Sequence, residues 1–226
     1  SLYNLTYINL SKIKLMKKII LSVFLIAALA NFATAQNLRL NGYAGYAFDD
    51  GIDSYTNSTT YYNGTIEGGF QWGAGIEFMV RPTMGIEFKY LHQDANAPFT
   101  YYNNGIKNQN FDLGLNYYLL EFNNYFQLSN EKIEPFIGAG LGMLAINAKS
   151  GGQSGNRTSF AWNIKGGTNI WLSQKVGIKL QAELLSASAA TGGAYFWSYW
   201  GPVYANTYTS LFQFDLGGGL VFKLGK

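Results

Sequence analysis

Cysteine is absent from the 226 residues of this chain. Its absence excludes a disulfide framework, a thiolate zinc site and a lipid-modified cysteine after a leader. Proline is scarce, with four residues, and histidine occurs once, as His92. Charged residues make up only 13% of the chain. Past residue 35 no stretch approaches 18 consecutive apolar residues, so we expect no membrane-spanning helix there, and nothing in the residue pattern calls for a cofactor or a metal.

The one long apolar run lies near the amino terminus, at residues 19–30 (IILSVFLIAALA), directly after Met16-Lys17-Lys18. Ala33-Thr34-Ala35 follows it and has the small residues of a cleavage site. This order is typical of a secretory signal peptide, which we expect to span residues 16–35 and to be cleaved after Ala35. We expect residues 1–15 to lie upstream of the initiator Met16.

Removing residues 1–35 changes the charge of the chain. It removes four of the 16 basic residues and none of the 13 acidic ones, which leaves a net charge of −1. No basic excess remains to attract nucleic acid, so we expect no such partner. Residues 36–226 suit one exported domain. If that domain enters a membrane without helices it must be a closed barrel, because only closure pairs every backbone polar group in lipid.

The exported part is rich in segments whose apolar residues alternate with polar ones or glycine. Eight strands are predicted: Leu38–Phe48, Ile66–Val80, Met84–Gln93, Asn110–Phe126, Ile133–Ile146, Ser159–Leu172, Val176–Leu185 and Tyr208–Leu224. Short connections (residues 81–83, 127–132 and 173–175) alternate with long polar ones (49–65, 94–109, 147–158 and 186–207). This rhythm is typical of an up-and-down barrel with short periplasmic turns and four long extracellular loops.

The composition of the two faces of each strand indicates which face is turned to the lumen and which to the outside of the barrel. In Val176–Leu184 the apolar residues share one face, and Lys179, Gln181 and Glu183 share the other. A narrow eight-stranded interior accommodates few large aromatic side chains, and it gains room where glycines such as Gly140 and Gly217 point inward. Aromatic residues also gather near the predicted strand ends, as at a membrane–water interface. We therefore predict an all-β, eight-stranded antiparallel transmembrane barrel with its apolar face toward lipid.

The fourth predicted strand breaks this alternation. Phe111, Leu113, Leu115 and Tyr117 are in phase, but Leu120, Phe122 and Phe126 have the opposite parity. A β-bulge near Tyr118–Leu119 restores the register and is one interpretation. A misplaced strand end is the other.

Charged residues of both signs fall in the predicted inward phase. They are Arg39, Glu67, Glu77, Glu87, Lys89, Asp112, Glu134, Lys165, Lys179, Glu183, Asp215 and Lys223. One interpretation is a network of buried ion pairs that fills the barrel and excludes a continuous file of water. The other is a narrow pore with a slight preference for cations.

Three further features are candidate sites. His92 lies two residues before Asp94 near a strand end, where outer-membrane lipid A deacylases have a His followed by a Ser; the nucleophile is missing, so we expect a polar rim residue and no enzyme. The glycine runs at 138–142 and 217–219 lie inside strands with no helix after them, which excludes phosphate loops. The aromatic cluster of the last long loop is the candidate surface for an extracellular partner: Tyr195, Phe196, Trp197, Tyr199 and Trp200. Alternatively, this segment extends the strands or folds over the barrel mouth.

Taken together, residues 16–35, the eight alternating segments and the final Gly219–Lys226 segment resemble the small outer-membrane β-barrel proteins of OmpA/OmpX type. The resemblance covers residues 36–226 and implies a monomer in the bacterial outer membrane, surrounded by its lipid. It also implies that the last strand is read by the barrel-assembly machinery, with Phe222 as the aromatic of that signal. No peptidoglycan-binding domain is implied.

Three functions remain open at this point. The leading hypothesis is a non-enzymatic integral outer-membrane protein with a structural or surface-interaction role in its extracellular loops. The second is a small channel, or porin, for ions or small solutes. The third is a soluble exported barrel that binds a ligand.

Overall fold

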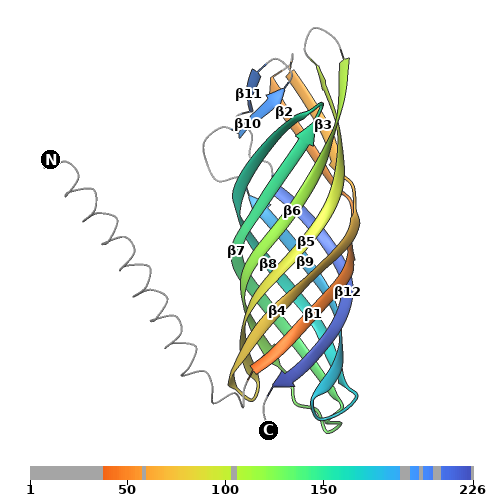
Figure 1. The fold of residues 1–226 in the computed structure, drawn as a ribbon, viewed down its shortest axis with the longest axis vertical. Coiled ribbons are helices and arrows are strands. Elements are labelled where there is room, and N and C mark those ends of the chain that lie inside the picture. The colour runs from red at the N-terminus through yellow and green to blue at the C-terminus, as the bar shows by residue number, and fades with distance from the viewer. Residues whose placement is uncertain are drawn as a thin grey trace, which may run out of the picture. The chain divides into compact units, whose positions relative to one another are not determined.

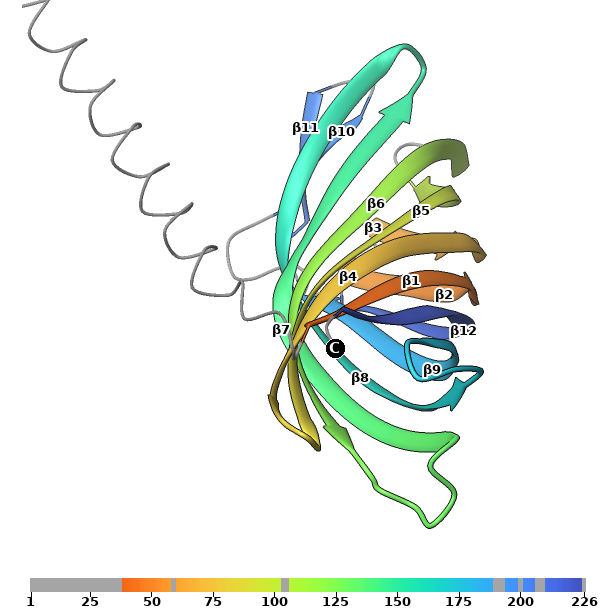
Figure 2. The same ribbon diagram turned by 60° about the horizontal axis from the view of Figure 1, so that its bottom comes forward.

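A closed ring of antiparallel strands forms the described part of the chain in the computed structural model (Figures 1 and 2). The structure describes residues 38–57, 60–102, 106–188, 194–198, 201–205 and 210–224, so the predicted signal peptide lies outside it. The described ring is built from β1 (Leu38–Ala47), β4 (Gly69–Arg81), β5 (Met84–Tyr102), β6 (Ile106–Tyr125), β7 (Ile133–Ser150), β8 (Gln153–Trp171), β9 (Val176–Ser188) and β12 (Ser210–Leu224). Each strand pairs with its neighbour in sequence, and β1 closes the ring against β12.

The two ends of the barrel differ in length and construction. Short turns join β4 to β5, β6 to β7 and β8 to β9 at one end, which we call the turn end. At the opposite end, the hairpin end, β5 to β8 continue well beyond the predicted strands. The predicted loops at residues 49–65, 94–109 and 147–158 are therefore largely strand. The prediction was too short there because polar residues on both faces hide the alternation that marks a half-buried strand.

A short hairpin takes part in the wall at the hairpin end. It consists of β2 (Asp50–Asn57) and β3 (Thr60–Ile66), and β3 pairs with the extended part of β5. The backbone N–H of Phe212 on β12 donates to the carboxylate of Asp50 over 2.8 Å, which ties this hairpin to the last strand. Burial raises the pKa of Asp50 above its ordinary value, and the Phe212 hydrogen bond opposes that shift. Two further strands, β10 (Ala194–Ser198) and β11 (Gly201–Ala205), pair with each other.

Large apolar side chains cover the outside of the ring. Phe70 is 63% exposed, and Ile76, Phe88 and Leu141 are more than half exposed, whereas charged residues lie buried inside. A water-soluble barrel has the reverse arrangement, because its apolar residues must leave the solvent. The predicted orientation is confirmed. No helix in the described part of the chain is long and apolar enough to cross a membrane.

The register of β6 differs from the prediction. Tyr118 pairs with Tyr90 on one side and with Met143 on the other, and pairing continues on both sides without a shift. Neither the bulge near Tyr118–Leu119 nor a misplaced strand end explains the change of parity, so both interpretations are wrong. Leu115 and Tyr117 point into the barrel and are fully buried, because this part of the lumen is lined by apolar rather than charged residues.

Candidate functional site

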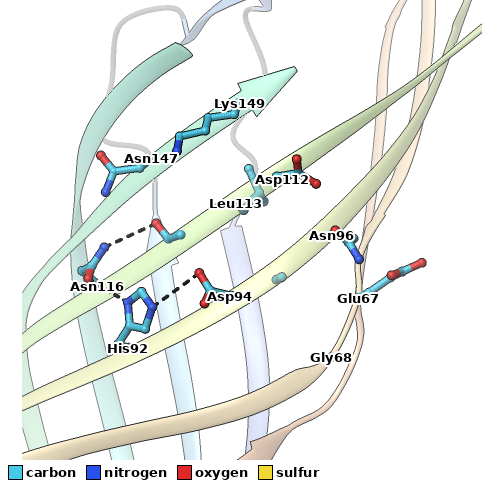
Figure 3. Close-up of a pocket in the computed structure, with 12 residues that line it drawn as sticks. Glu67, Gly68, His92, Asp94, Asn96, Asp112, Leu113, Asn116, Asn147 and Lys149 are labelled. Atoms are coloured by element: carbon cyan, nitrogen blue, oxygen red, sulfur yellow. Dashed lines mark hydrogen bonds and ion pairs between the residues drawn. The ribbon is translucent and has the colours of Figure 1, made fainter. Parts of the chain in front are cut away.

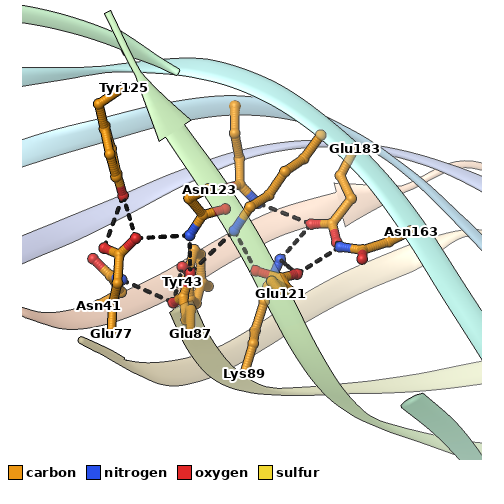
Figure 4. Close-up of polar contacts among 12 residues, drawn as sticks. Asn41, Tyr43, Glu77, Glu87, Lys89, Glu121, Asn123, Tyr125, Asn163 and Glu183 are labelled. Carbon is orange, nitrogen blue, oxygen red and sulfur yellow. Dashed lines mark hydrogen bonds and ion pairs between the residues drawn. The ribbon is translucent and has the colours of Figure 1, made fainter. Parts of the chain in front are cut away.

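The lumen near the turn end holds a dense cluster of buried charges (Figure 4). Glu87 lies at its centre. Its carboxylate accepts hydrogen bonds from Asn41 over 2.8 Å and from the hydroxyl of Tyr43, and it pairs with Lys165 over 3.1 Å. Asn123 donates to the same carboxylate. Every oxygen of Glu87 thus has a partner, which a charge removed from water requires.

Glu121 links this centre to the opposite wall. It forms ion pairs with Lys165 and, over 3.5 Å, with Lys89, which in turn contacts Glu183 over 2.5 Å. The amide of Asn163 donates to both Glu121 and Glu183. All of these charged side chains are fully buried. Two lysines and three glutamates therefore form one connected network across the lumen rather than isolated pairs.

Inward glycines provide the space for these carboxylates. A Cβ on Gly75 would collide with the side chain of Glu87, and one on Gly85 would collide with Glu77. On β7, a Cβ on Gly140 would lie 2.7 Å from Cγ of Glu121. The alternation of glycine and charge seen in the sequence thus has a steric origin, because each long side chain occupies the volume that a neighbouring side chain would need.

At the turn end the network continues with aromatic groups. Arg39 forms a bidentate pair with Glu134 at 2.9 and 3.0 Å, and its guanidinium lies 4.5 Å from the ring centre of Tyr125. Tyr125 donates to the carboxylate of Glu77 at 2.6 Å. The indole of Trp171 also points inward, with Lys223 3.6 Å from its ring centre. Large rings and paired charges together close this end of the lumen.

Above the charged layer, toward the hairpin end, the lumen becomes apolar. The buried apolar side chains of this layer are Ile66, Leu91, Ala95, Ala97, Leu115, Tyr117, Leu119, Leu144, Ala161, Leu185, Ala187 and Leu211, and Tyr43 connects them to the charged layer. They come from strands on all sides of the ring. Three buried amides, Gln71, Gln93 and Gln213, lie among them, and Tyr117 donates to Gln213 over 3.2 Å. The apolar side chains between these amides offer water no hydrogen-bond partners, so the layer opposes a continuous file of water or ions.

Eleven buried side-chain nitrogen and oxygen atoms lack a hydrogen-bond partner within the described residues, and two of these atoms belong to charged groups. The ammonium of Lys179 makes no hydrogen bond there and lies 4.6 Å from the ring centre of Phe136. One carboxylate oxygen of Asp215 is also without a partner there. Both charged side chains face the lumen, as the residues of the network do. Unlike Glu87, neither has a partner for every one of its polar atoms.

The structure places the residues of the predicted lumen set as follows. Arg39, Glu77, Glu87, Lys89, Lys165, Lys179, Glu183 and Asp215 are buried, and Glu134 and Lys223 are half-buried. Glu67 and Asp112 are exposed and lie outside the network. Glu67 follows the last residue of β3, where the chain leaves the strand and the inward phase is lost. Asp112 faces outward because β6 has no bulge along its described length.

Sequence reasoning missed Glu121, a central residue of the network. The apolar residues that flank it on β6 belong to the outward phase, and their change of parity drew attention to a bulge instead of to the glutamate between them. The polar partners Asn41, Asn123 and Asn163 were missed as well. The feature of the sequence that could have identified them is an asparagine at an inward-facing position of a predicted strand.

His92 lies on the outer wall. Its ring contacts the indole of Trp72 with 5.5 Å between ring centres, and its Nδ1 lies 2.9 Å from the amide oxygen of Asn116. Its other ring nitrogen is 3.4 Å from the carboxylate of Asp94 (Figure 3). Trp72, Tyr90 and Tyr118 form neighbouring ring contacts on this wall. His92 is therefore a polar residue in the middle of β5, and the predicted position at the outer strand end is wrong because β5 continues to Tyr102.

The other predicted sites are less fully described. Tyr195, Phe196 and Trp197 lie in β10, of which only the backbone is described, and Tyr199 and Trp200 lie outside the described residues. Phe222 on β12 faces outward, opposite Leu40 of β1. In the described part of the chain, no three acidic or histidine side chains are placed to hold a metal ion.

Comparison with known proteins places the fold. Neisserial surface protein A superposes with a TM-score of 0.53 at 14% sequence identity, over 83% of this chain and 97% of that one. OprG from Pseudomonas aeruginosa gives 0.51 at 13% identity, over 85% and 97%. The fold is that of the small outer-membrane barrels. The same fold class includes the outer-membrane protease OmpT from Escherichia coli, with a TM-score of 0.51 at 7% identity over 84% and 98%.

Sequence comparison adds nothing to this likeness, since no family model and no curated protein matches the chain. A barrel fold does not specify an activity, as a surface protein and a protease in the same comparison illustrate. Function therefore has to be argued from the lumen, the outer wall and the hairpin end of this barrel.

Proposed function

We propose that this barrel is an integral protein of the bacterial outer membrane whose filled lumen is a rigid, non-conducting support. Its apolar outer face meets the lipid, the turn end faces the periplasm, and a non-enzymatic, surface-interaction role belongs to the hairpin end. The observation that carries the proposal is the two-layered lumen. Ion pairs fill the turn half, and Leu115, Tyr117 and Leu119 close the hairpin half.

A support of this kind needs a lumen that resists deformation. The buried pairs meet that need, because breaking one leaves an uncompensated charge in a dry interior. The extended strands β5 to β8 then carry the hairpin end away from the membrane surface. An extracellular ligand of the aromatic segment at residues 195–200, insertion by the assembly machinery through the strand that contains Phe222, and a monomeric state all belong to this proposal.

The first test is electrical. Refolded residues 36–226 would be added to planar lipid bilayers, with a large general porin as the positive control. We expect no stable current steps from this protein under conditions in which the porin conducts. Regular steps that scale with salt concentration would contradict the filled lumen and support the small-channel alternative.

Location needs a separate test, since a silent bilayer is also the result expected of a protein that never inserted. We expect the protein in the outer-membrane fraction, and we expect it to migrate differently in detergent gels before and after boiling, as a folded barrel does. Recovery in the soluble periplasmic fraction would overturn the proposal.

A further inference from the structure

The outer wall changes character just above the ring contacts of Trp72, Tyr90 and Tyr118, which we call the aromatic girdle. Toward the hairpin end, the outward side chains of β5, β6 and β7 become polar and border a depression of about 580 Å³ (Figure 3). The polar residues around it are Glu67, His92, Asp94, Asn96, Asp112, Asn116, Asn147 and Lys149. Residues of an aromatic girdle mark the boundary between hydrocarbon and headgroups, so this depression lies at headgroup level.

The floor of the depression is hollow because β6 has a glycine at its centre. A Cβ on Gly114 would lie 3.8 Å from Cβ of Asn147 and 4.0 Å from the carboxylate of Asp94, which is ordinary contact distance. By contrast, a Cβ on Gly142 of the neighbouring strand would collide with the backbone of Tyr118. Strand packing therefore requires Gly142 but not Gly114. The effect of Gly114 is to leave space between polar side chains.

The rim nearest the girdle is already ordered. The amide oxygen of Asn116 accepts from the hydroxyl of Tyr90 over 2.9 Å and lies 2.9 Å from Nδ1 of His92. His92 also stands between Trp72 and Asp94. Side chains fixed in this way lose little conformational freedom when they bind a ligand, which favours affinity.

The chemistry of the rim selects the class of ligand. The carboxylates of Glu67, Asp94 and Asp112 outnumber the single ammonium of Lys149, so an anionic group would be repelled. The carboxylates and the three amides supply acceptors and donors for neutral hydroxyl groups. Trp72, next to His92, adds an aromatic edge. These features fit a polyhydroxylated ring, that is, a sugar.

We propose that this depression binds the sugar headgroup of a glycolipid in the outer leaflet, with Asp94 and Asn147 as hydrogen-bond partners of its hydroxyls. The proposal rests on the membrane orientation given under the proposed function. The aromatic girdle indicates that the ligand is a lipid of the same leaflet. The hydrocarbon chains of such a lipid would lie along the apolar wall below Trp72, while its sugar would reach Gly114 at the floor of the depression.

The test compares retained lipid. Refolded barrel would be reconstituted in phosphatidylcholine vesicles that contain either an uncharged glycosyl diacylglycerol or the same fraction of phosphatidylglycerol, then extracted and analysed by native mass spectrometry. We expect the uncharged glycosyl diacylglycerol to remain bound and phosphatidylglycerol to be lost. Gly114→Val, which fills the floor, and Asp94→Ala, which removes an acceptor, should each weaken retention about tenfold.

The matched control is Gly42→Val. Gly42 also faces outward, on β1, and a Cβ there meets nothing within 4 Å among the described residues, but it lies away from the depression. It should retain the glycosyl diacylglycerol as the wild type does. Equal retention by Gly114→Val and the wild type would overturn the proposal, as would equal retention of phosphatidylglycerol. Competition by the free, uncharged headgroup sugar at the same affinity would overturn the lipid source and point to a soluble sugar.

Failure of this proposal is distinguishable from failure of the proposed function. Heat-dependent gel migration reports membrane folding for every variant, and conductance reports the lumen. A barrel that folds and stays silent but retains no glycolipid would refute the headgroup site alone. A barrel that conducts yet retains glycolipid would refute the filled lumen alone.

Discussion

The two halves of the lumen are lined by different kinds of side chain. In the turn half, Glu87 and Glu121 depend on specific partners that come from other strands. In the hairpin half, Leu115 and Leu144 only have to fill volume. A charged layer is specific and intolerant of partial removal, whereas an apolar layer loses stability in proportion to the atoms removed. The difference teaches that the charged half fixes register, and the apolar half excludes water.

Glu121→Leu tests the charged half and should have the largest effect on stability. The substitution leaves Lys165 and Lys89 without one of their carboxylates in a dry interior. We expect a loss of about 3–5 kcal/mol in the free energy of unfolding. Urea titration of the folded fraction in lipid vesicles would measure it. Glu121→Gln, which still accepts from Asn163, is the matched control and should lose less; an unchanged midpoint for Glu121→Leu would refute the network.

In the apolar half the corresponding change is Leu115→Ala. It opens a cavity among fully buried side chains, and we expect a loss of about 3 kcal/mol. The same urea titration applies. Leu120→Ala, on the same strand but facing lipid at 48% exposure, serves as the control and should cost clearly less. Equal losses at both positions would mean that the hairpin half is not tightly packed.

A smaller effect is expected where a neutral group supports a charge. Tyr125→Phe removes the hydroxyl that donates to Glu77 but keeps the ring beneath Arg39. We expect a loss of about 1.5–3 kcal/mol, the usual contribution of a hydrogen bond to a charged group. Tyr118→Phe on the outer wall is the control. If both variants unfold at the same urea concentration, the Glu77 contact contributes nothing measurable.

The smallest effect concerns the hairpin end. The folded state raises the pKa of Asp50, so wild-type stability falls as pH rises from the ordinary Asp pKa of about 4 through the raised one. Asp50→Asn can still accept from Phe212 and carries no charge to desolvate. It should equal the wild type at low pH and exceed it slightly, by less than about 1 kcal/mol, at neutral pH. A variant that is less stable than the wild type at neutral pH would contradict this account.

The sequence predicts the fold best where every outward residue is apolar and every inward residue is polar or glycine. Val176–Leu184 alternates cleanly, and its apolar residues do face outward, since lipid on one side and a charged lumen on the other impose a period of two. The strand at Phe111–Tyr117 was misread for a physical reason. Above the girdle the lumen is apolar and the outer wall is polar, so the apolar residues of an alternating segment face inward there and the polar residues face outward.

The candidate site was less accessible to sequence reasoning than the fold. Most of the lumen charges could be found by parity, because Lys89 and Glu183 stand between apolar neighbours. Their partners could not, since Lys89 and Glu183 come from strands far apart in sequence and meet only after the ring closes. The outer depression was missed entirely. Nothing in a single strand shows that Asp94, Gly114 and Asn147 border one hollow.

The seam between β1 and β12 has a kinetic consequence. Tyr43, Ala44 and Gly45 face three successive glycines there, at 217, 218 and 219, so few side chains meet across the middle of the seam. Backbone hydrogen bonds supply most of its cohesion, and these form only once both strands are aligned. We therefore expect β1 and β12 to pair last during insertion. Until they pair, the barrel can remain open at this seam without the loss of many side-chain contacts.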